Sequence, residues 1–574
     1  MRPRELLDRI GFRPRLIEHL RGYGRDDLRA DAVAGVTVGF VALPLAMAFA
    51  IASGVKPEQG LITAIVGGLL ISLLGGSRVQ IGGPAGAFVV LLYGIVERYG
   101  LANLLISVIL AGVLLFVMGL LKFGNLVRFV PVSVVIGFTN GIAVVIGFSQ
   151  IRDFLGLQVD KMPANFLSQV AVLWNELGTV NPAALGIGVA SLLMMLCWPK
   201  PAARADAGRW ASWWSRIGRV PPTIVVLSIG VLAVTVLNLP VETIGTRFGG
   251  IPQQLPAPRL PTFDWDGVQQ LVAPTISIAV LGAIESLLCA RVADALIDDR
   301  HDPNQELMAQ GLANFITPFF GGIAATGTIA RTVTNVRAGA RTPVAGAIHA
   351  LTLLLTMLLL APLARHIPLA SLAAILLVVA WNMGEWRAFA HLRHYTVSYR
   401  TILLSAFALT VIFDLTVAVQ IGLGLACLFF IHRMSTLTRL EPIRLAPEQA
   451  RTADGRSVHA WRIFGSLFFG SVTKLEPLFD RQAERPDVLI LEMHQLVNLD
   501  TSGLDVLESL RRMTDKRGAR LILCDVNEQP RSLLRRSGFI DRLGDGGVER
   551  DLDAALALAR APRAAGREPS ADNR

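Results

Sequence analysis

Long apolar segments without charge are the feature that most restricts how this chain can fold. Ala102–Leu121 and Phe129–Ile151 contain no charged residue, and Thr342–Ala364 contains only the titratable His349. An α-helix needs about 20 mostly apolar residues to cross a membrane. The chain is 52% hydrophobic and 17% charged, whereas a soluble protein carries about 25% charged residues. The sequence therefore predicts an α-helical polytopic membrane protein and argues against a soluble enzyme.

Further apolar runs bring the expected number of spans to about fourteen, although some are too short to cross as one regular helix. These further runs are Ala32–Gly54, Leu61–Gly75, Ala85–Val96, Pro182–Trp198, Thr223–Leu239, Leu271–Ala290, Met308–Phe320, Thr328–Val336, Leu369–Trp381, Thr401–Phe413 and Leu415–Ile431. Basic residues gather in alternate loops, beginning with the one that holds Arg78, and basic loops face the cytoplasm. An even number of spans then predicts that both termini are cytoplasmic in a bacterial plasma (inner) membrane.

The composition divides the chain into four parts. Residues 1–30 form a basic, amphipathic segment, which we expect to be a cytoplasmic leader, and residues 31–436 form the transmembrane part. Residues 438–562 alternate strand-like and helix-like patterns, which predicts a small cytoplasmic α/β domain. Residues 563–574 are polar and are expected to be a disordered tail.

Two glycine-rich segments occupy matching places in the two halves of the apolar region. One is Ser77–Ala87, and the other is Phe320–Arg331. Each consists of a short extended piece followed by a half-length helix in the third apolar segment of its half. Interrupted segments at matching positions indicate a transporter binding site. The N-termini of two half-helices favour an anion, although close helix packing through glycine is the alternative explanation.

Two charged residues interrupt the apolar runs near these segments. Glu285 lies within an apolar run, where a carboxylate is costly unless it is paired, protonated or hydrated. We interpret it as a proton-coupling group, with pairing to Arg291 as the structural alternative. Arg331 follows in the first turn of the second half-helix and offers a planar fork that matches a carboxylate or sulfate. Its alternative role is to extend toward the membrane interface.

The order and spacing of four motifs resemble the SulP anion permeases, the bacterial relatives of the solute carrier twenty-six proteins. The motifs are 31–35 with 43–57, 82–87, 285–288 with 304–314, and 328–340. The C-terminal Asp500-Thr501-Ser502-Gly503 resembles the loop of a STAS domain. The resemblance covers nearly the whole chain.

This resemblance implies a seven-plus-seven inverted repeat, with half-helices in spans 3 and 10, and a STAS domain that supports dimerisation. It also implies that the substrate lies between the two half-helices, beside the first span. Carried over by position, it places substrate contacts at Leu45, Phe49, Ala85, Gly86, Ala87, Thr328 and Arg331. In the STAS loop it marks Asp500, Thr501 and Ser502 as regulatory candidates, for which helix capping is the simpler role.

The second half of the chain is most similar to bacterial C4-dicarboxylic acid transporters of the DauA type. Two departures from the family pattern matter for coupling. Leu45 stands where some members carry Glu or Gln, and Cys289 stands where some sodium-coupled bicarbonate members carry an acid. Both departures leave Glu285 as the main coupling candidate and favour protons over sodium. The expected function is therefore proton-coupled uptake of C4-dicarboxylates such as succinate or fumarate.

Several alternatives stay open at this stage. The substrate is alternatively sulfate or bicarbonate, and transport is alternatively uncoupled exchange or channel conduction. A regulatory role of the STAS domain is a third possibility, with a cytoplasmic protein as its partner. Nucleic acid is not an expected partner. The four cysteines, Cys197, Cys289, Cys427 and Cys524, show no metal-ligand spacing, and catalytic motifs are lacking, so we expect no metal site, cofactor or enzymatic activity.

Overall fold

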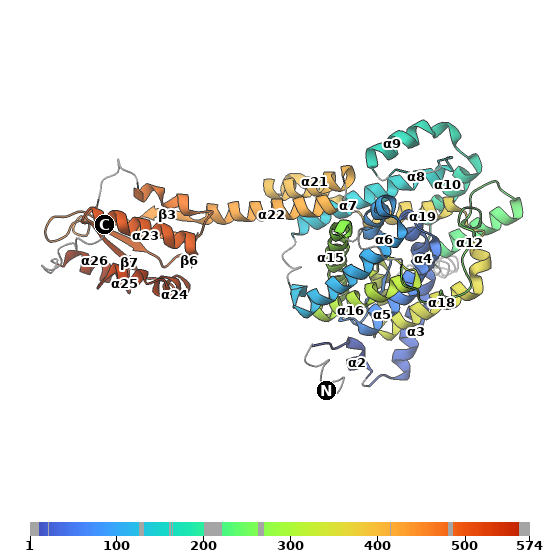
Figure 1. Ribbon diagram of the computed structural model, residues 1–574, viewed down its shortest axis with the longest axis horizontal. Helices are drawn as coiled ribbons and strands as arrows, with labels where there is room; N and C mark the ends of the chain where they lie inside the picture. Colours follow the sequence, from blue (N-terminus) through green and yellow to red (C-terminus); the bar gives the residue numbers. More distant parts are fainter. Residues whose placement is uncertain are drawn as a thin grey trace, which may run out of the picture. The chain divides into compact units, whose positions relative to one another are not determined.

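The computed structural model describes residues 11–20, 22–125, 131–159, 162–163, 165–199, 221–261, 269–413, 415–479 and 486–561 (Figure 1). The chain separates into two compact units, Met1–Leu423 and Gly424–Arg574. The sequence boundary at 436–438 lies later, at the end of the last apolar helix, Leu415–Leu437. The first ten residues of the expected leader and the expected disordered tail lie outside the described residues.

The first half of the membrane unit contains one long helix for most of the predicted apolar runs. Its elements are α2 (Arg15–His19), α3 (Arg25–Ala52), α4 (Pro57–Ile62), the π-helical turn η1 (Thr63–Gly67), α5 (Gly68–Leu74), β1 (Gly82–Gly83), α6 (Gly86–Leu120), α7 (Val132–Ser149), α8 (Ile151–Leu155), α9 (Phe166–Asn175), η3 (Leu177–Thr179), α10 (Pro182–Leu196) and α12 (Pro222–Leu237). Helix α6 breaks at Gly100, where φ is 80° and ψ is 171°, so it contains two of the predicted runs.

The second half repeats the pattern of a short strand that leads into a helix. Its elements are α13 (Ile244–Phe248), η4 (Gln269–Leu271), α15 (Val272–Ile297), α16 (Pro303–Ile316), η5 (Thr317–Phe320), β2 (Thr326–Gly327), α17 (Ile329–Arg337), α18 (Val344–Ala364), α19 (Leu369–Met383), α20 (Trp386–Ala390), η6 (Leu392–His394), α21 (Val397–Ile412) and α22 (Leu415–Leu437).

Six helical segments in the described part of the chain are long and apolar enough to span a membrane. They are Arg25–Ala52, Pro57–Leu74, Gly86–Leu120, Val132–Leu155, Gln269–Ile297 and Val344–Ala364. Five shorter apolar helices of 10–17 residues accompany them: Pro182–Leu196, Pro222–Leu237, Leu369–Met383, Val397–Ile412 and Gly424–Leu437. The membrane character is as predicted, whereas the number of fourteen spans stays a prediction.

Helices of the two halves pack against each other in pairs. Helix α3 packs on α18, α6 on α16, α7 on α21, and α10 on α19. Small residues let the backbones approach closely, as is common in membranes. A Cβ atom on Gly112 of α6 would lie 2.7 Å from the carbonyl oxygen of Gly311 on α16, and one on Gly311 would lie 2.7 Å from that of Gly112. The two halves therefore form one packed body around the half-helices.

The C-terminal unit is built on a six-stranded sheet. The strands are β3 (Arg439–Pro442), β4 (Val458–Leu467), β5 (Val488–Glu492), β6 (Leu496–Leu499), β7 (Arg520–Cys524) and β8 (Val548–Glu549). The order is β3-β4-β5-β7-β8, with β6 beside the end of β4. Strand β3 is antiparallel to β4, and the other pairs are parallel.

Alternating residues of the strands face two separate apolar layers. The helices of this unit are η7 (Val472–Phe479), α23 (Thr501–Lys516), α24 (Glu528–Arg536), α25 (Phe539–Leu543) and α26 (Leu552–Arg560). Leu489 and Leu491 of β5 pack with the layer of α23, α24 and α25. Val488 and Ile490 pack with α26 instead, as the two-residue period of a strand requires. The predicted α/β domain is therefore present.

The predicted regulatory loop starts helix α23. Asp500 is its N-cap, and its Oδ1 accepts a hydrogen bond from the Gly503 amide at 2.8 Å. Thr501 and Ser502 are the next two residues, and Thr501 is exposed. Capping, the simpler role expected of this loop, is thus performed by Asp500, and the two hydroxyls are left for other uses.

Candidate anion-binding site

A minimal sheet joins the two glycine-rich segments in the middle of the membrane unit. Gly82 and Gly83 of β1 pair antiparallel with Gly327 and Thr326 of β2. The amide of Thr328 adds a further bond to the carbonyl oxygen of Ile81, at 2.9 Å. Extended backbone at membrane depth is tolerated where the protein shields it from lipid, and both strands are buried. The predicted pair of matching segments therefore forms one structure.

Two helices begin where the strands end, and neither has a side-chain cap. Ala85 precedes α6 and Thr328 precedes α17; both are in extended conformation, and neither side chain accepts a bond from the helix amides. The first amides of a helix have no partner within the helix, and the helix dipole adds partial positive charge there. Two uncapped N-termini on adjoining segments favour an anion.

Arg331, on the second half-helix, is hydrogen-bonded to the extended segment that precedes the first half-helix. It is 1% exposed, and its Nη2 donates a hydrogen bond to the carbonyl oxygen of Pro84 at 3.2 Å. Its Nη1 is buried without a partner. A Cβ atom at Gly83, where φ is +152°, would lie 2.4 Å from this Nη1, so glycine is needed for the approach. No carboxylate among the described residues lies within 4.0 Å of Arg331, and an anion would supply the missing partner.

The other predicted substrate residues are buried around the same point. Leu45, Phe49 and Ala85 are each 6% exposed, Ala87 is 3% and Thr328 is 7%. A Cβ atom on Gly86 would lie 3.3 Å from Cε1 of Phe49, so the ring contacts the start of α6. Leu45 lies one turn before Phe49 on the same face of α3. The structure places Phe49 at this helix end and Leu45 beside it.

Met383 also reaches this point, although sequence reasoning did not select it as a site residue. A Cβ atom on Gly86 would lie 3.2 Å from Sδ of Met383, which is the last residue of α19. The thioether therefore lies against the N-terminus of α6 from a helix of the other half. Nothing in the sequence near residue 383 indicates this contact, because it depends on how α19 packs.

The threonine hydroxyls near the site are engaged with the protein. Thr326 Oγ1 donates to the carbonyl oxygen of Gly282 at 3.2 Å, and Thr328 Oγ1 donates to that of Ile81 at 2.9 Å. Thr332 Oγ1 accepts a bond from the Ile81 amide at 3.0 Å and lies 3.2 Å from Sγ of Cys289. These hydroxyls brace the two-stranded sheet, so the contacts left for an anion are amides and Arg331.

Glu285 has no polar partner in the described part of the chain. It lies on α15 and is partly buried. No hydrogen bond or ion pair joins it to Arg291, which is exposed. The structural alternative of a Glu285–Arg291 pair is therefore not seen among the described residues. A partly buried carboxylate without partners is the arrangement that favours proton uptake.

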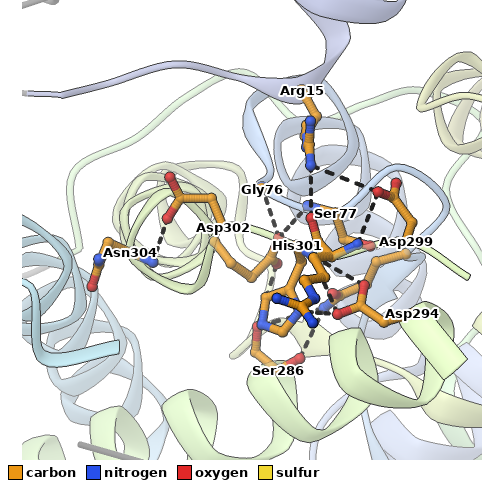
Figure 2. A network of polar contacts seen from close by, with 12 residues as sticks. Arg15, Gly76, Ser77, Ser286, Asp294, Asp299, His301, Asp302 and Asn304 are labelled. Carbon is orange, nitrogen blue, oxygen red and sulfur yellow. Dashed lines mark hydrogen bonds and ion pairs between the residues drawn. The ribbon is translucent and has the colours of Figure 1, made fainter. Parts of the chain in front are cut away.

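Glu306, unlike Glu285, has several hydrogen-bond partners. It belongs to the motif at residues 304–314, for which the sequence predicted no role. It is 0% exposed. Its Oε2 accepts bonds from the amides of Gly76 and Ser77, at 2.9 and 3.2 Å. Its Oε1 accepts from Ser286 Oγ at 3.3 Å and from Gln310 Nε2 at 2.9 Å. Figure 2 shows Gly76 and Ser77 beside Ser286 and the loop of His301 and Asp302. Glu306 therefore holds the turn at Gly76 and Ser77, which precedes the first half-helix, against Ser286 of α15.

His349 interrupts the apolar run that forms α18. It is 0% exposed on α18, but neither ring nitrogen has a partner among the described residues. Arg331 and His349 are thus two of several buried polar side chains in the described part of the membrane unit that keep a donor or acceptor without a hydrogen-bond partner.

Two family models match the chain. The model of the sulfate permease family covers residues 28–406, and that of the STAS domain covers residues 453–555. The first match includes the two strands, both half-helices, Glu285 and Glu306. The second includes the sheet of the C-terminal unit from β4 onward and the Asp500 loop.

Curated relatives align with most of the chain. YvdB of Bacillus subtilis, whose name proposes sulfate transport, is 42% identical over 526 residues, which cover 91% of this chain and 96% of that protein. BicA of Picosynechococcus, named a bicarbonate transporter, is 28% identical over 512 residues, which cover 85% of this chain and 87% of that protein.

Solved structures show the same fold. The transmembrane domain of a cyanobacterial bicarbonate transporter, BicA, has a TM-score of 0.61 and 30% identity, covering 69% of this chain and 98% of that one. The structure of SLC26A9 has a TM-score of 0.83 at 17% identity and covers 95% of this chain and 92% of that one, which shows likeness of fold. The predicted fold class is confirmed, and the chain belongs to the sulfate permease family as an anion transporter, not an enzyme, with a C-terminal STAS domain.

Proposed function

We propose that this transporter takes up a small divalent oxyanion together with protons, and that the anion binds between the N-termini of α6 and α17. The observation that carries the proposal is Arg331, a buried guanidinium whose Nη1 has no partner and which has no carboxylate within 4.0 Å among the described residues. An isolated buried charge is costly, so its retention at the meeting point of two uncapped helices is best explained by an anionic ligand.

The charge at this point favours a divalent substrate. Arg331 contributes one positive charge, and each helix N-terminus contributes roughly half of one. Roughly two positive charges then face the substrate, which a dicarboxylate or sulfate neutralises and bicarbonate does not. A planar guanidinium also suits the paired oxygens of either ion.

Two substrates fit this description. The resemblance of the second half of the chain to DauA-type proteins supports C4-dicarboxylates such as succinate or fumarate. The name of the relative with 42% identity supports sulfate. Bicarbonate is the monovalent alternative, since BicA proteins are named for it. Succinate and sulfate differ in length, so the wall formed by Phe49 and Met383 would discriminate between them.

Glu285 supports the proton-coupling part of the proposal. As an acid without polar partners, it gains a proton more readily than a hydrogen-bonded carboxylate does. Protonation in a mildly acidic external medium would remove a negative charge from the core and favour anion entry. Release of the proton on the cytoplasmic side would then favour release of the anion. Uncoupled exchange and channel conduction are the alternatives, and they need no titrating group.

The test is counterflow in proteoliposomes with labelled succinate, sulfate and bicarbonate. The pH gradient and the sodium gradient are imposed separately. We expect accumulation of one divalent anion, driven by an acidic exterior and indifferent to sodium. Accumulation driven by sodium alone, or equilibration without accumulation, would contradict proton coupling. Exclusive transport of bicarbonate would contradict the charge argument.

We further propose that the protein lies in the bacterial inner membrane with both termini in the cytoplasm. The basic loops support this orientation. A single cysteine at Lys56 and one at Arg387, in a background without exposed cysteines, test it through labelling of intact cells with an impermeant reagent. Labelling at residue 56 and protection at residue 387 are expected, and the reverse pattern would contradict the orientation.

For the C-terminal unit we propose support of a homodimer and regulation through Thr501 or Ser502, by phosphorylation or by a cytoplasmic protein. The exposed position of Thr501 after the Asp500 cap supports this role. Deletion from Thr438 onward is expected to reduce transport or dimerisation while substrate binding in detergent persists, because each span satisfies its own backbone. Loss of binding in the truncated protein would contradict the domain division.

A further inference from the structure

A second polar cavity lies in the membrane unit away from Arg331. It has a volume of about 350 Å³ and is lined by the ends of α3 and α7, the outer part of α6, and residues of α8, α9 and α13. Val89, on its wall, lies one turn after Gly86 on α6. Glu97, at its far side, lies two turns further along the same helix. The cavity therefore runs along α6 from the neighbourhood of the anion site toward one end of the membrane unit.

Arg152 lines this cavity and lacks an adequate counter-charge. Its side chain is 21% exposed, and its Nε is buried without a hydrogen-bond partner. Among the described residues, the one carboxylate oxygen within 4.0 Å of it is Oδ1 of Asp153, 4.0 Å from Nε. That same oxygen lies 2.8 Å from Nη1 of Arg247. One carboxylate thus serves two arginines, and Arg247 binds it at the shorter distance.

The other charges near Arg152 do not change this balance in its favour. Arg247 also pairs with Glu242, which lies outside the cavity wall. Glu97 faces the cavity from α6. Among the described residues, two arginines (Arg152 and Arg247) and two acids (Glu97 and Asp153) line the cavity, so their formal charges balance. Arg152 lies on this wall without a close carboxylate of its own.

We propose that Arg152 forms an outer capture site for the transported anion, from which the anion moves along α6 to Arg331. This inference rests on the proposed function, because it assigns a second step to the same substrate. The balanced charge of the cavity makes the capture weak, which allows the anion to move on.

The cavity lies at the end of the membrane unit where α3 finishes. The α4–η1–α5 segment runs antiparallel to α3, so it finishes at the opposite end of the membrane unit. The turn at Gly76, which is hydrogen-bonded to Glu306, follows at that opposite end. Arg152 therefore serves anions that enter from the side opposite that turn, which is the outside if both termini are cytoplasmic. Its effect should be limited to transport from that side.

The test compares Arg152→Gln with Lys56→Gln in proteoliposomes of defined orientation. Lys56 is exposed beyond the end of α3 and does not line the cavity, so its replacement removes the same charge from the same end. At about 20 mM salt, Arg152→Gln is expected to raise the KM of the transported anion about five-fold for entry from the end of the membrane unit where α3 finishes. The KM for entry from the opposite end should equal that of the parent. High salt should shrink the difference, because charge attraction is screened within about 3 Å at 1 M.

An equal rise in KM for Lys56→Gln would overturn the proposal, and so would an unchanged KM in Arg152→Gln or a rise for both directions. Arg152→Lys keeps the charge without the fork and is expected to give an intermediate KM, which guards against misfolding of the Gln variant.

A binding measurement separates this inference from the proposed function. Sulfate is titrated in detergent at low salt into Arg331→Ala and into Arg331→Ala/Arg152→Gln. Weak residual binding in the first that falls at least ten-fold in the second supports the outer site, even if the parent transports none of the three anions. Absence of residual binding in the first, or its persistence in the second, would overturn it.

Discussion

Two glutamates of the membrane unit, Glu285 on α15 and Glu306 on α16, show how differently the same side chain is used near the two half-helices. Glu306 is fully buried and accepts four hydrogen bonds, from Gly76, Ser77, Ser286 and Gln310. Glu285 lies one residue before Ser286 in the sequence, and the described residues offer it no partner. Four donors hold the carboxylate of Glu306 in place, whereas no hydrogen bond among the described residues restrains the carboxylate of Glu285.

The difference indicates a division of labour between charges. Charged side chains with hydrogen-bond partners, such as Glu306, hold in place the segment that carries β1 and leads into α6. Unpartnered charges such as Arg331 and Glu285 are available to substrate and proton. Removal of a partnered charge should therefore mainly reduce stability, and removal of an unpartnered one should mainly reduce function.

Glu306→Gln is expected to have the largest effect, a loss of stability of about 3 kcal/mol. The new amide group would face donors, and at least one buried donor would lose its acceptor. The measurement is thermal unfolding in detergent, together with the yield of monodisperse protein. Gln310→Met, which removes one of the four donors and keeps the carboxylate, is the control, with an expected loss of about 1 kcal/mol. Wild-type stability of Glu306→Gln would contradict the structural role.

Arg331→Ala is expected to lower affinity at the central site at least 100-fold, which corresponds to about 2.8 kcal/mol. Its unfolding temperature should stay close to that of the parent, because the guanidinium makes one hydrogen bond, to Pro84. Arg331→Lys should restore binding only in part, since lysine lacks the planar fork. The measurement is titration with the transported anion in detergent, and unchanged affinity of the Ala variant would exclude Arg331 from the site.

Glu285→Gln is expected to reduce accumulation driven by a pH gradient about ten-fold while exchange without a gradient continues. The amide imitates the protonated acid permanently, so it allows binding and prevents coupling. The measurement is uptake into liposomes with an imposed pH gradient beside counterflow without one. A variant that still concentrates the anion like the parent would show that another group carries the proton.

A partnered carboxylate near water should show the smallest effect. In the C-terminal unit, Nη2 of Arg511 donates to Oε1 of Glu508 at 2.9 Å and holds the pKa of Glu508 below its ordinary value of 4.5. A depressed folded pKa contributes stability above pH 4.5, and this contribution is lost as the pH falls through the folded pKa. We expect less than about 1 kcal/mol, since water screens such pairs.

The measurement for Glu508 is denaturant unfolding of the full chain, followed by a probe in the C-terminal unit, at pH 7 and at pH 3 to 4. Glu508→Gln should remove the part of the acid destabilisation that comes from this pair. An identical pH dependence in the variant would show that Glu508 does not contribute.

The sequence by itself indicated most of the elements that build the site. Uncharged runs such as Ala102–Leu121 predict helices in lipid, because an apolar helix is the simplest way to satisfy a backbone there. Glycines marked the interrupted segments, and the structure pairs Gly82 and Gly83 of the first with Gly327 and Thr326 of the second. Arg331 and Glu285 stood out because charge is rare in apolar runs. Each of these signals is local, so it can be read along the chain.

The tertiary structure alone decided which charges have partners. Glu306 and the Gly76 turn are 230 residues apart in the sequence, and Arg331 and Pro84 are 247 apart. Met383 contacts Gly86 from the other half of the chain. Such contacts follow from how helices of the two halves pack, and the periodicity of a segment carries no information about its distant neighbours. The sequence therefore determined where the charges lie along the chain, and only the packing decided that Glu306 has four hydrogen bonds while Glu285 and the Nη1 of Arg331 have no partner among the described residues.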